Sequence, residues 1–250
     1  MAMKIVPINS ATHRTLRVRQ SRNFPHASSQ HMAILVACEI MSTAINYPVV
    51  FAKHPDTGRF LCLAILGLES GENLFFDKDG WKATYIPLNI TRTPFAMCES
   101  GTGDDAMLIC IDEDSPYISE TEGAALFDEN GGQTEFLDNV VSSLSDMASH
   151  ERHTQLFIKT LVDLRLLVPI SIVMTDSEGG DTELMEATYT ISEGRLRELP
   201  DEQLLDLHSA DYLGLIYSLI NSLEIVNRMI ALKNQRSNKS IANIQIKYSQ

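Results

Sequence analysis

The stretch from Tyr47 to Pro116 constrains the fold most, because it consists of short β-type runs separated by turn residues. Residues 49–53 and 59–68 are mostly apolar, and the segment HPDTG between them supplies Pro, Asp and Gly for a tight turn. We therefore predict a β-hairpin there. Further strands are predicted at Leu74–Phe76, residues 81–86 and Met107–Ile111.

A helical period begins in the second half of the chain. Phe136, Val140, Leu144 and Met147 recur at spacings of three and four residues, and the pattern continues through Leu164. This predicts a helix pair, or one long helix with a break near Ser149 and His150. A second hairpin is predicted from residues 168–175 and 183–191, and two helices are predicted from Pro200 to about His208 and from Tyr212 to Leu232.

Runs of strands followed by helices, without regular alternation, predict an α+β fold. We expect an antiparallel, β-rich N-terminal half with hairpins and a helical C-terminal half with one further hairpin. The expected organisation is a single domain over residues 1–232, with a soft internal boundary near residue 130. Residues 233–250 are expected to form a polar, frayed tail.

The N-terminal residues lack an apolar segment after their first charge, which argues against a secretory signal. No uninterrupted apolar run approaches the ~20 residues that span a bilayer. We therefore expect a cytoplasmic protein without a membrane span. The four cysteines are expected to be reduced thiols, because no two are spaced as a CxxC pair.

Charge is unevenly distributed along this chain of net charge −13. Residues 1–38 contain no acid, residues 93–151 contain no Lys or Arg, and no acid follows Glu224. We expect the basic ends to fold back onto the acidic middle or to stay solvated. An anionic partner is the alternative, but the strong negative charge and the lack of interleaved aromatic residues argue against nucleic acid.

Two groups of residues are candidate binding sites. Asp112, Glu113 and Asp114 follow a predicted strand and could contact a cation or a substrate, with Arg92 as an additional candidate. The alternative is a turn, because Asp114 opens an Asp-Ser-Pro sequence. Trp81 and Tyr85 could line a shallow binding surface, or Trp81 could cap a small β-core.

Other possible centres do not have the spacing that their chemistry needs. His150 and His153 are three residues apart, whereas the zincin motif places its histidines four apart on one helix face. The glycine-containing segment 101–105 lacks a lysine and carries two acids that would repel phosphate. We predict no catalytic residue, no metal site and no cofactor.

Several segments in order carry a family resemblance. YPVVFAKHPDTGRF, LGLESGENLF, the segment ending in TPFAM, CIDEDSP and LPDEQLLDLHSADYLGLIYSLINSL together resemble the SapC family of bacterial proteins, from about Ile5 to about Leu232. The resemblance implies a surface-layer-associated or peptide-transport-related role, and it carries no catalytic residues over to this chain.

Three hypotheses follow. The first is a non-catalytic binding or accessory protein with an unknown protein or peptide partner. The second is an enzyme, or an enzyme subunit, with an acidic site at Asp112, Glu113 and Asp114. The third is a surface structural protein that self-assembles, which would make the chain a homo-oligomer.

Overall fold

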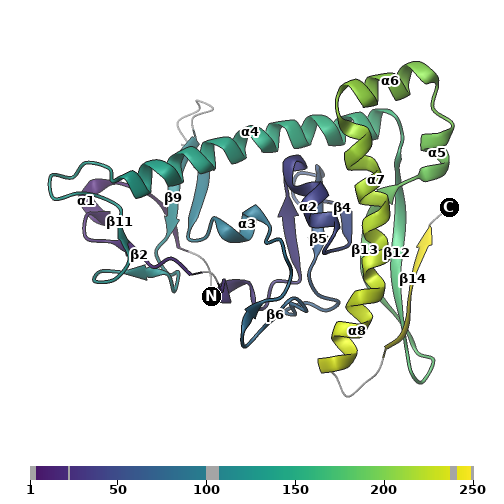
Figure 1. Cartoon of the computed structure of the whole chain (residues 1–250), viewed down its shortest axis with the longest axis horizontal. Helices are drawn as coiled ribbons and strands as arrows, with labels where there is room; N and C mark the ends of the chain where they lie inside the picture. Colours follow the sequence, from purple (N-terminus) through teal and green to yellow (C-terminus); the bar gives the residue numbers. More distant parts are fainter. Residues whose placement is uncertain (1–3, 22, 100–106, 237–240, 249–250) are drawn as a thin grey trace. The chain divides into compact units, whose positions relative to one another are not determined.

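The computed structural model describes residues 4–21, 23–99, 107–236 and 241–248 (Figure 1). The predicted α+β class is confirmed. The segment 101–105, considered above as a phosphate loop, lies outside the described residues.

The chain forms two compact units that are discontinuous in sequence. Unit 1 combines residues 1–26 with 89–150, and unit 2 combines residues 27–88 with 151–250. No unit begins or ends near residue 130, and the single-domain organisation stays a prediction. Three elements carry the chain from one unit into the other: η1 (Pro25–Ala27), α3 (Leu88–Thr91) and α4 (Glu135–Asp163).

Unit 1 is built from two small antiparallel sheets around one apolar cluster. The first sheet has the order β1-β9-β8 and the second β10-β2-β11. Val18, Phe95, Ile111 and Leu126 are among the buried residues of the cluster, and the first half of α4 packs Leu137 and Leu144 against it. The elements are β1 (Ile5–Pro7), α1 (Ser10–His13), β2 (Arg17–Val18), β8 (Phe95–Glu99), β9 (Met107–Asp112), β10 (Ile118–Ser119) and β11 (Ala124–Ala125).

Unit 2 is built on a six-stranded antiparallel sheet with the order β14-β12-β13-β4-β5-β3. Its strands are β3 (Met32–Leu35), β4 (Val49–Lys53), β5 (Phe60–Ile65), β12 (Leu167–Asp176), β13 (Asp181–Ile191) and β14 (Ile241–Tyr248), and a separate hairpin is formed by β6 (Phe76–Asp77) and β7 (Gly80–Trp81). The two predicted hairpins are β4-β5 and β12-β13, and both are present. They meet where β13 pairs with β4.

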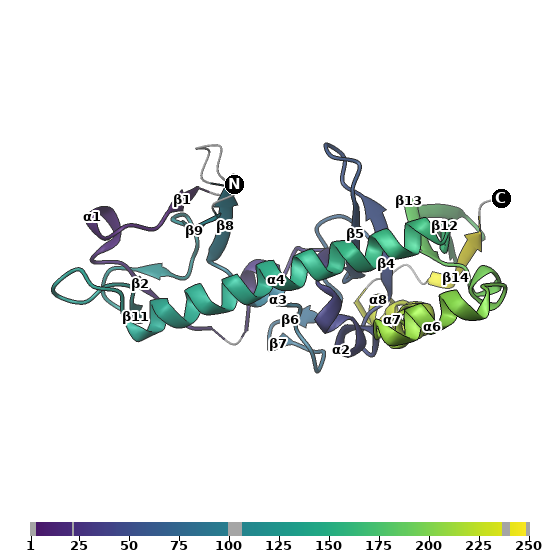
Figure 2. The ribbon, with the colours of Figure 1, turned by 90° about the horizontal axis from the view of Figure 1, so that it is seen from above.

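Unit 2 also contains helices. The helices are η2 (Ala37–Glu39), α2 (Ile40–Ala44), α5 (Glu193–Arg197), α6 (Asp201–Ser209), α7 (Tyr212–Ser222), η3 (Leu223–Ile225) and α8 (Val226–Arg236). Of these, α2, α7 and α8 contact the sheet. α7 contacts β13 and β4, α8 contacts β14, and α2 lies beside α7 (Figure 2). The buried Ser222 hydroxyl accepts a 3.0 Å hydrogen bond from the Val49 amide, which ties the start of β4 to α7.

Several predictions about single elements are wrong. The strand predicted at residues 81–86 ends at Trp81, the second residue of β7. α4 runs from Glu135 to Asp163 without the predicted break near Ser149, whose hydroxyl donates to the carbonyl of Ser145 and so remains compatible with the helix. The tail 233–250 is not simply frayed, because α8 extends to Arg236 and β14 adds an eight-residue strand to the sheet. β14 pairs with β12 along its length. Its isoleucines are separated by mostly polar residues, so the composition of the tail did not indicate a strand.

The continuous helical run Tyr212–Arg236 is long and apolar enough, by length and composition alone, to cross a membrane. Its buried positions, among them Ile216, Leu219, Val226 and Met229, recur every three or four residues and form the face that packs in unit 2. Core helices of this kind satisfy the same length and composition criteria, so the predicted lack of a membrane span stays a prediction.

Candidate functional site

The predicted acidic site lies in unit 1, where Glu113 joins two basic residues of the N-terminal segment. Lys4 Nζ lies 2.6 Å from Glu113 Oε2, and His13 Nε2 lies 3.0 Å from Glu113 Oε1. The hydrogen bond from Lys4, followed by that from His13, lowers the pKa of Glu113. A carboxyl with a lowered pKa is ionised at neutral pH, so Glu113 is suited to ion pairing rather than to proton donation.

His13 is buried, and both of its ring nitrogens are engaged. Nδ1 accepts a 3.1 Å hydrogen bond from the Asn9 amide, which leaves Nε2–H to donate to Glu113. A histidine held in this way has no free nitrogen to bind a metal or to accept a substrate proton. It fixes α1 against the turn that follows β9.

The other acids of the predicted site shape the turn. Asp112 Oδ1 accepts hydrogen bonds from the amides of Lys4, at 3.0 Å, and Asp114, at 3.3 Å. Arg92 is not part of this arrangement among the described contacts: its Nε donates to Asn89 Oδ1 at 2.6 Å, and burial lowers its pKa. Whether these four residues bind a ligand stays a prediction.

Trp81 and Tyr85 lie in unit 2, and the structure brings them together through a third residue, Tyr47. Trp81 Nε1 donates to Tyr47 Oη at 2.7 Å, and Tyr47 Oη donates to the Tyr85 carbonyl at 2.5 Å. Tyr47 is fully buried, and desolvation raises its pKa. The polar atoms of Trp81 and Tyr47 are thus engaged with each other, so this group holds the 81–85 segment on the core.

Glu39, which the sequence analysis did not single out, belongs to the same region. Its carboxylate is only 2% exposed and accepts hydrogen bonds from Tyr85 Oη (3.0 Å), the Leu88 amide (2.9 Å) and the Val36 amide (3.1 Å). Desolvation, with the negative charge of Glu39 as the second cause, raises the pKa of Tyr85. A single acid inside an apolar helical segment is the signal that could have identified it.

Basic residues near the C-terminus also bond internally. Lys233 Nζ lies 2.6 Å from Glu72 Oε1 and 3.1 Å from Glu69 Oε1, and Arg236 donates to the Asn73 carbonyl. With Lys4 on Glu113 in unit 1, these contacts show that basic residues of both ends pair with acids of their own unit. The expectation that the basic ends fold back onto the acidic middle is confirmed for Lys4, whereas Lys233 pairs with acids that lie outside residues 93–151.

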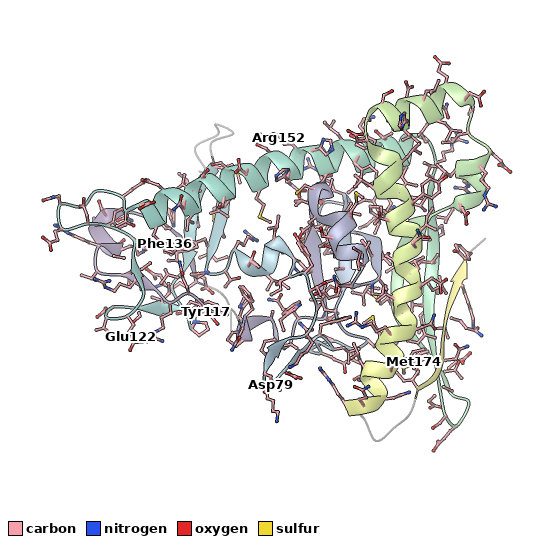
Figure 3. The ribbon with its side chains drawn as sticks, viewed as in Figure 1. Asp79, Tyr117, Glu122, Phe136, Arg152 and Met174 are labelled. Carbon is pink, nitrogen blue, oxygen red and sulfur yellow. The ribbon has the colours of Figure 1, made fainter. Side chains whose placement is uncertain are left out.

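A groove in unit 2 lies between the helical run α7-η3-α8 and the outermost strand, β14. We call it the α8–β14 groove; it has a volume of about 360 Å³. Its apolar lining residues are Ile191, Ile220, Leu223, Val226, Ile244, Ile246 and Tyr248, and its polar ones are Glu193, Glu224 and Asn227. Met174, labelled in Figure 3, pairs with Ile244 and so belongs to the same face of the sheet.

The two carboxylates of the groove are not equivalent. Glu193 forms an ion pair with Arg197 one helical turn later in α5. Glu224 is exposed on η3, and within the described residues its side chain makes no ion pair. The residues that line the α8–β14 groove are therefore mostly apolar in type, although most of its exposed lining surface is polar, and Glu224 is not ion-paired within the described residues.

In the described part of the chain, no group of three or more His, Cys, Asp or Glu residues is arranged to hold a metal ion. His153 contacts the ring of Tyr212 edge-on, with 5.7 Å between ring centres. Of the cysteines, Cys38 is exposed, whereas Cys62 and Cys110 are buried; burial raises the pKa of Cys110 to about 12.

The SapC family model matches residues 8–229, and the chain belongs to the SapC family. A search of curated proteins and a search of solved structures found no match to the chain. The matched range includes α7 and η3 but ends before β14, so one wall of the α8–β14 groove lies outside it.

Proposed function

We propose that this SapC-family chain is a non-catalytic accessory protein that binds a protein or peptide partner through the α8–β14 groove. The observation that carries the proposal is the composition of the groove, with seven apolar side chains and a carboxylate on Glu224 that is not ion-paired within the described residues. Concave, mostly apolar surfaces with few polar groups are typical of binding sites. A link to surface layers or to peptide transport comes from the family resemblance alone.

The contacts of the other candidate groups support a structural role for them. His13, Glu113, Tyr47 and Glu39 direct their polar atoms to neighbouring residues of the same unit. Residues engaged in this way stabilise turns and helix positions rather than face a substrate. This distribution favours binding at the groove over chemistry at the acidic turn.

The proposal is tested by selecting a phage-displayed peptide library on the full-length chain. Peptides enriched on the wild type are expected to bind Tyr248→Ala at least about tenfold more weakly, because this variant removes an exposed aromatic ring from the groove lining. Tyr217→Ala is the matched control: Tyr217 is 49% exposed and lies on α7, but it does not line the groove. Failure to enrich any peptide, or equal weakening in both variants, would contradict the proposal.

A separate assay addresses catalysis. The wild type is screened for turnover of a panel of substrates. If it turns over any of them, and if Asp112→Asn or Asp114→Asn abolishes that turnover while circular dichroism shows an intact fold, the protein is an enzyme with its site at the acidic turn.

A further inference from the structure

We infer that the partner binds as an extended segment that adds a strand to β14, with apolar side chains and a lysine or arginine directed into the α8–β14 groove. The inference rests on the proposed function and adds to it the backbone mode and the chemical class of the partner.

The first observation is that β14 is an outer strand of the six-stranded sheet. Among the residues that the structure describes, it pairs along one edge only, with β12, from Ile170 opposite Tyr248 to Asp176 opposite Ile241. In an antiparallel edge strand, the amide and carbonyl groups of alternate residues point away from the sheet and can pair with another chain. β14 is eight residues long, contains no proline and carries a single charge, Lys247, so it lacks most features that block such pairing.

The second observation is that the groove lies along the same strand. Ile244, Ile246 and Tyr248 alternate along β14 and all line the groove, whereas the intervening Gln245 and Lys247 are exposed. A strand added beside β14 would place every second side chain on the groove face, next to these three residues. Exposure of the lining residues increases along β14 from Ile244, at 7%, to Tyr248, at 63%, so apolar surface remains for an added segment to cover.

The third observation is the charge. Glu224 and Glu193 are both lining residues of the groove; Glu193 is paired with Arg197, whereas Glu224 has no ion pair within the described residues. A basic side chain on the partner would pair with Glu224, which is exposed on η3. A second copy of this chain is disfavoured as the occupant, because each copy has a net charge of −13.

The test uses a synthetic peptide of about eight residues, which matches β14 in length. Valine and threonine alternate along it, one valine is replaced by lysine, and both ends are blocked. Two further versions carry N-methyl groups, either on all residues of the threonine set or on all residues of the valine and lysine set. Successive amides of a strand point to opposite edges, so only one of the two sets can donate to β14.

We expect the parent peptide to bind the full-length chain, one N-methylated version to bind at least about tenfold more weakly, and the other to bind within about twofold of the parent. Glu224→Lys is expected to weaken binding of the parent peptide about tenfold, whereas Glu202→Lys, an exposed acid of α6 outside the groove, is expected to leave it unchanged.

Three results would overturn the inference. If both N-methylated versions bind like the parent and Glu224→Lys still weakens binding, the groove binds side chains without strand addition, and the proposed function survives. If the parent peptide does not bind while the library selection succeeds, the partner class is wrong and the groove proposal again survives. If the chain alone dimerises and Tyr248→Asp makes it monomeric in light scattering, a second copy occupies the edge.

Discussion

Tyr85 Oη donates a 3.0 Å hydrogen bond to the buried carboxylate of Glu39, which lies 46 residues earlier in the chain. This contact fixes the segment before α3 to the start of α2. Replacing Tyr85 by Phe removes a donor from a buried charged acceptor, and we expect a loss of about 1–3 kcal/mol in the free energy of unfolding, measured by urea denaturation. Tyr217→Phe, at an exposed position, is the control, and a loss below about 0.5 kcal/mol for Tyr85→Phe would contradict this role.

Tyr47 is predicted to be a second key residue for stability. Its hydroxyl connects Trp81 Nε1 to the Tyr85 carbonyl, so Tyr47→Phe leaves a partly buried donor and a partly buried acceptor without this partner. We expect destabilisation of about 1–3 kcal/mol. Trp81 is the single tryptophan of the chain, so its fluorescence reports the transition directly. An unfolding curve that coincides with the wild type would show that water replaces the hydroxyl.

The ion pairs of Glu113 predict a pH dependence. Hydrogen bonds from Lys4 and His13 lower the pKa of Glu113 in the folded state, so the stabilisation is present above the ordinary value of 4.5 and is lost as the pH falls through the folded-state pKa. The thermal midpoint of Glu113→Gln is therefore expected to lie below that of the wild type at pH 6, with a gap that closes as the solution is acidified below ~4.5. Glu120→Gln, at an exposed acid of the same unit, is expected to show no such trend. A gap that stays constant with pH would contradict the pairing.

The cysteines are expected to differ in reactivity. Cys38 is exposed, and Cys62 and Cys110 are buried, so a thiol reagent added to the native protein is expected to modify Cys38 first and Cys62 and Cys110 only after unfolding. Desolvation, followed by the negative charge of Glu39, raises the pKa of Cys38, so its reaction is expected to be slower than that of a free thiol and to accelerate with pH. If the fast phase of thiol labelling is absent in Cys38→Ser, Cys38 is the residue that is modified first. Rapid native labelling of Cys62 would contradict the packing of β5.

The sequence predicted the elements whose signals are local. The β4-β5 hairpin follows from the Pro-Asp-Gly turn, and the β12-β13 hairpin from β-branched residues around a Gly-Gly turn. β14 was missed because its isoleucines are separated by polar residues in a basic tail, and its partner β12 is distant in sequence. The continuity of α4 was missed because serine interrupts the apolar period there, while its hydroxyl bonds to the preceding turn.

The candidate sites were harder to predict, since their contacts are tertiary. Trp81 and Tyr85 were singled out together, but Tyr47, which connects them, has no pattern that relates it to either. The acidic turn was recognised as a turn or a binding site, whereas its pairing with Lys4 and His13 depends on β1 lying beside β9. The α8–β14 groove could not be anticipated without β14.

Binding of a peptide in the α8–β14 groove is tested most directly by NMR. The full-length chain is labelled at isoleucine methyl groups and titrated with the peptide of alternating valine and threonine that carries one lysine. We expect shifts of Ile220, Ile244 and Ile246, which line the groove, and none of Ile111, which is buried in unit 1. Spectra that stay unchanged at saturating peptide, or shifts confined to isoleucines outside the groove, would contradict binding in this groove.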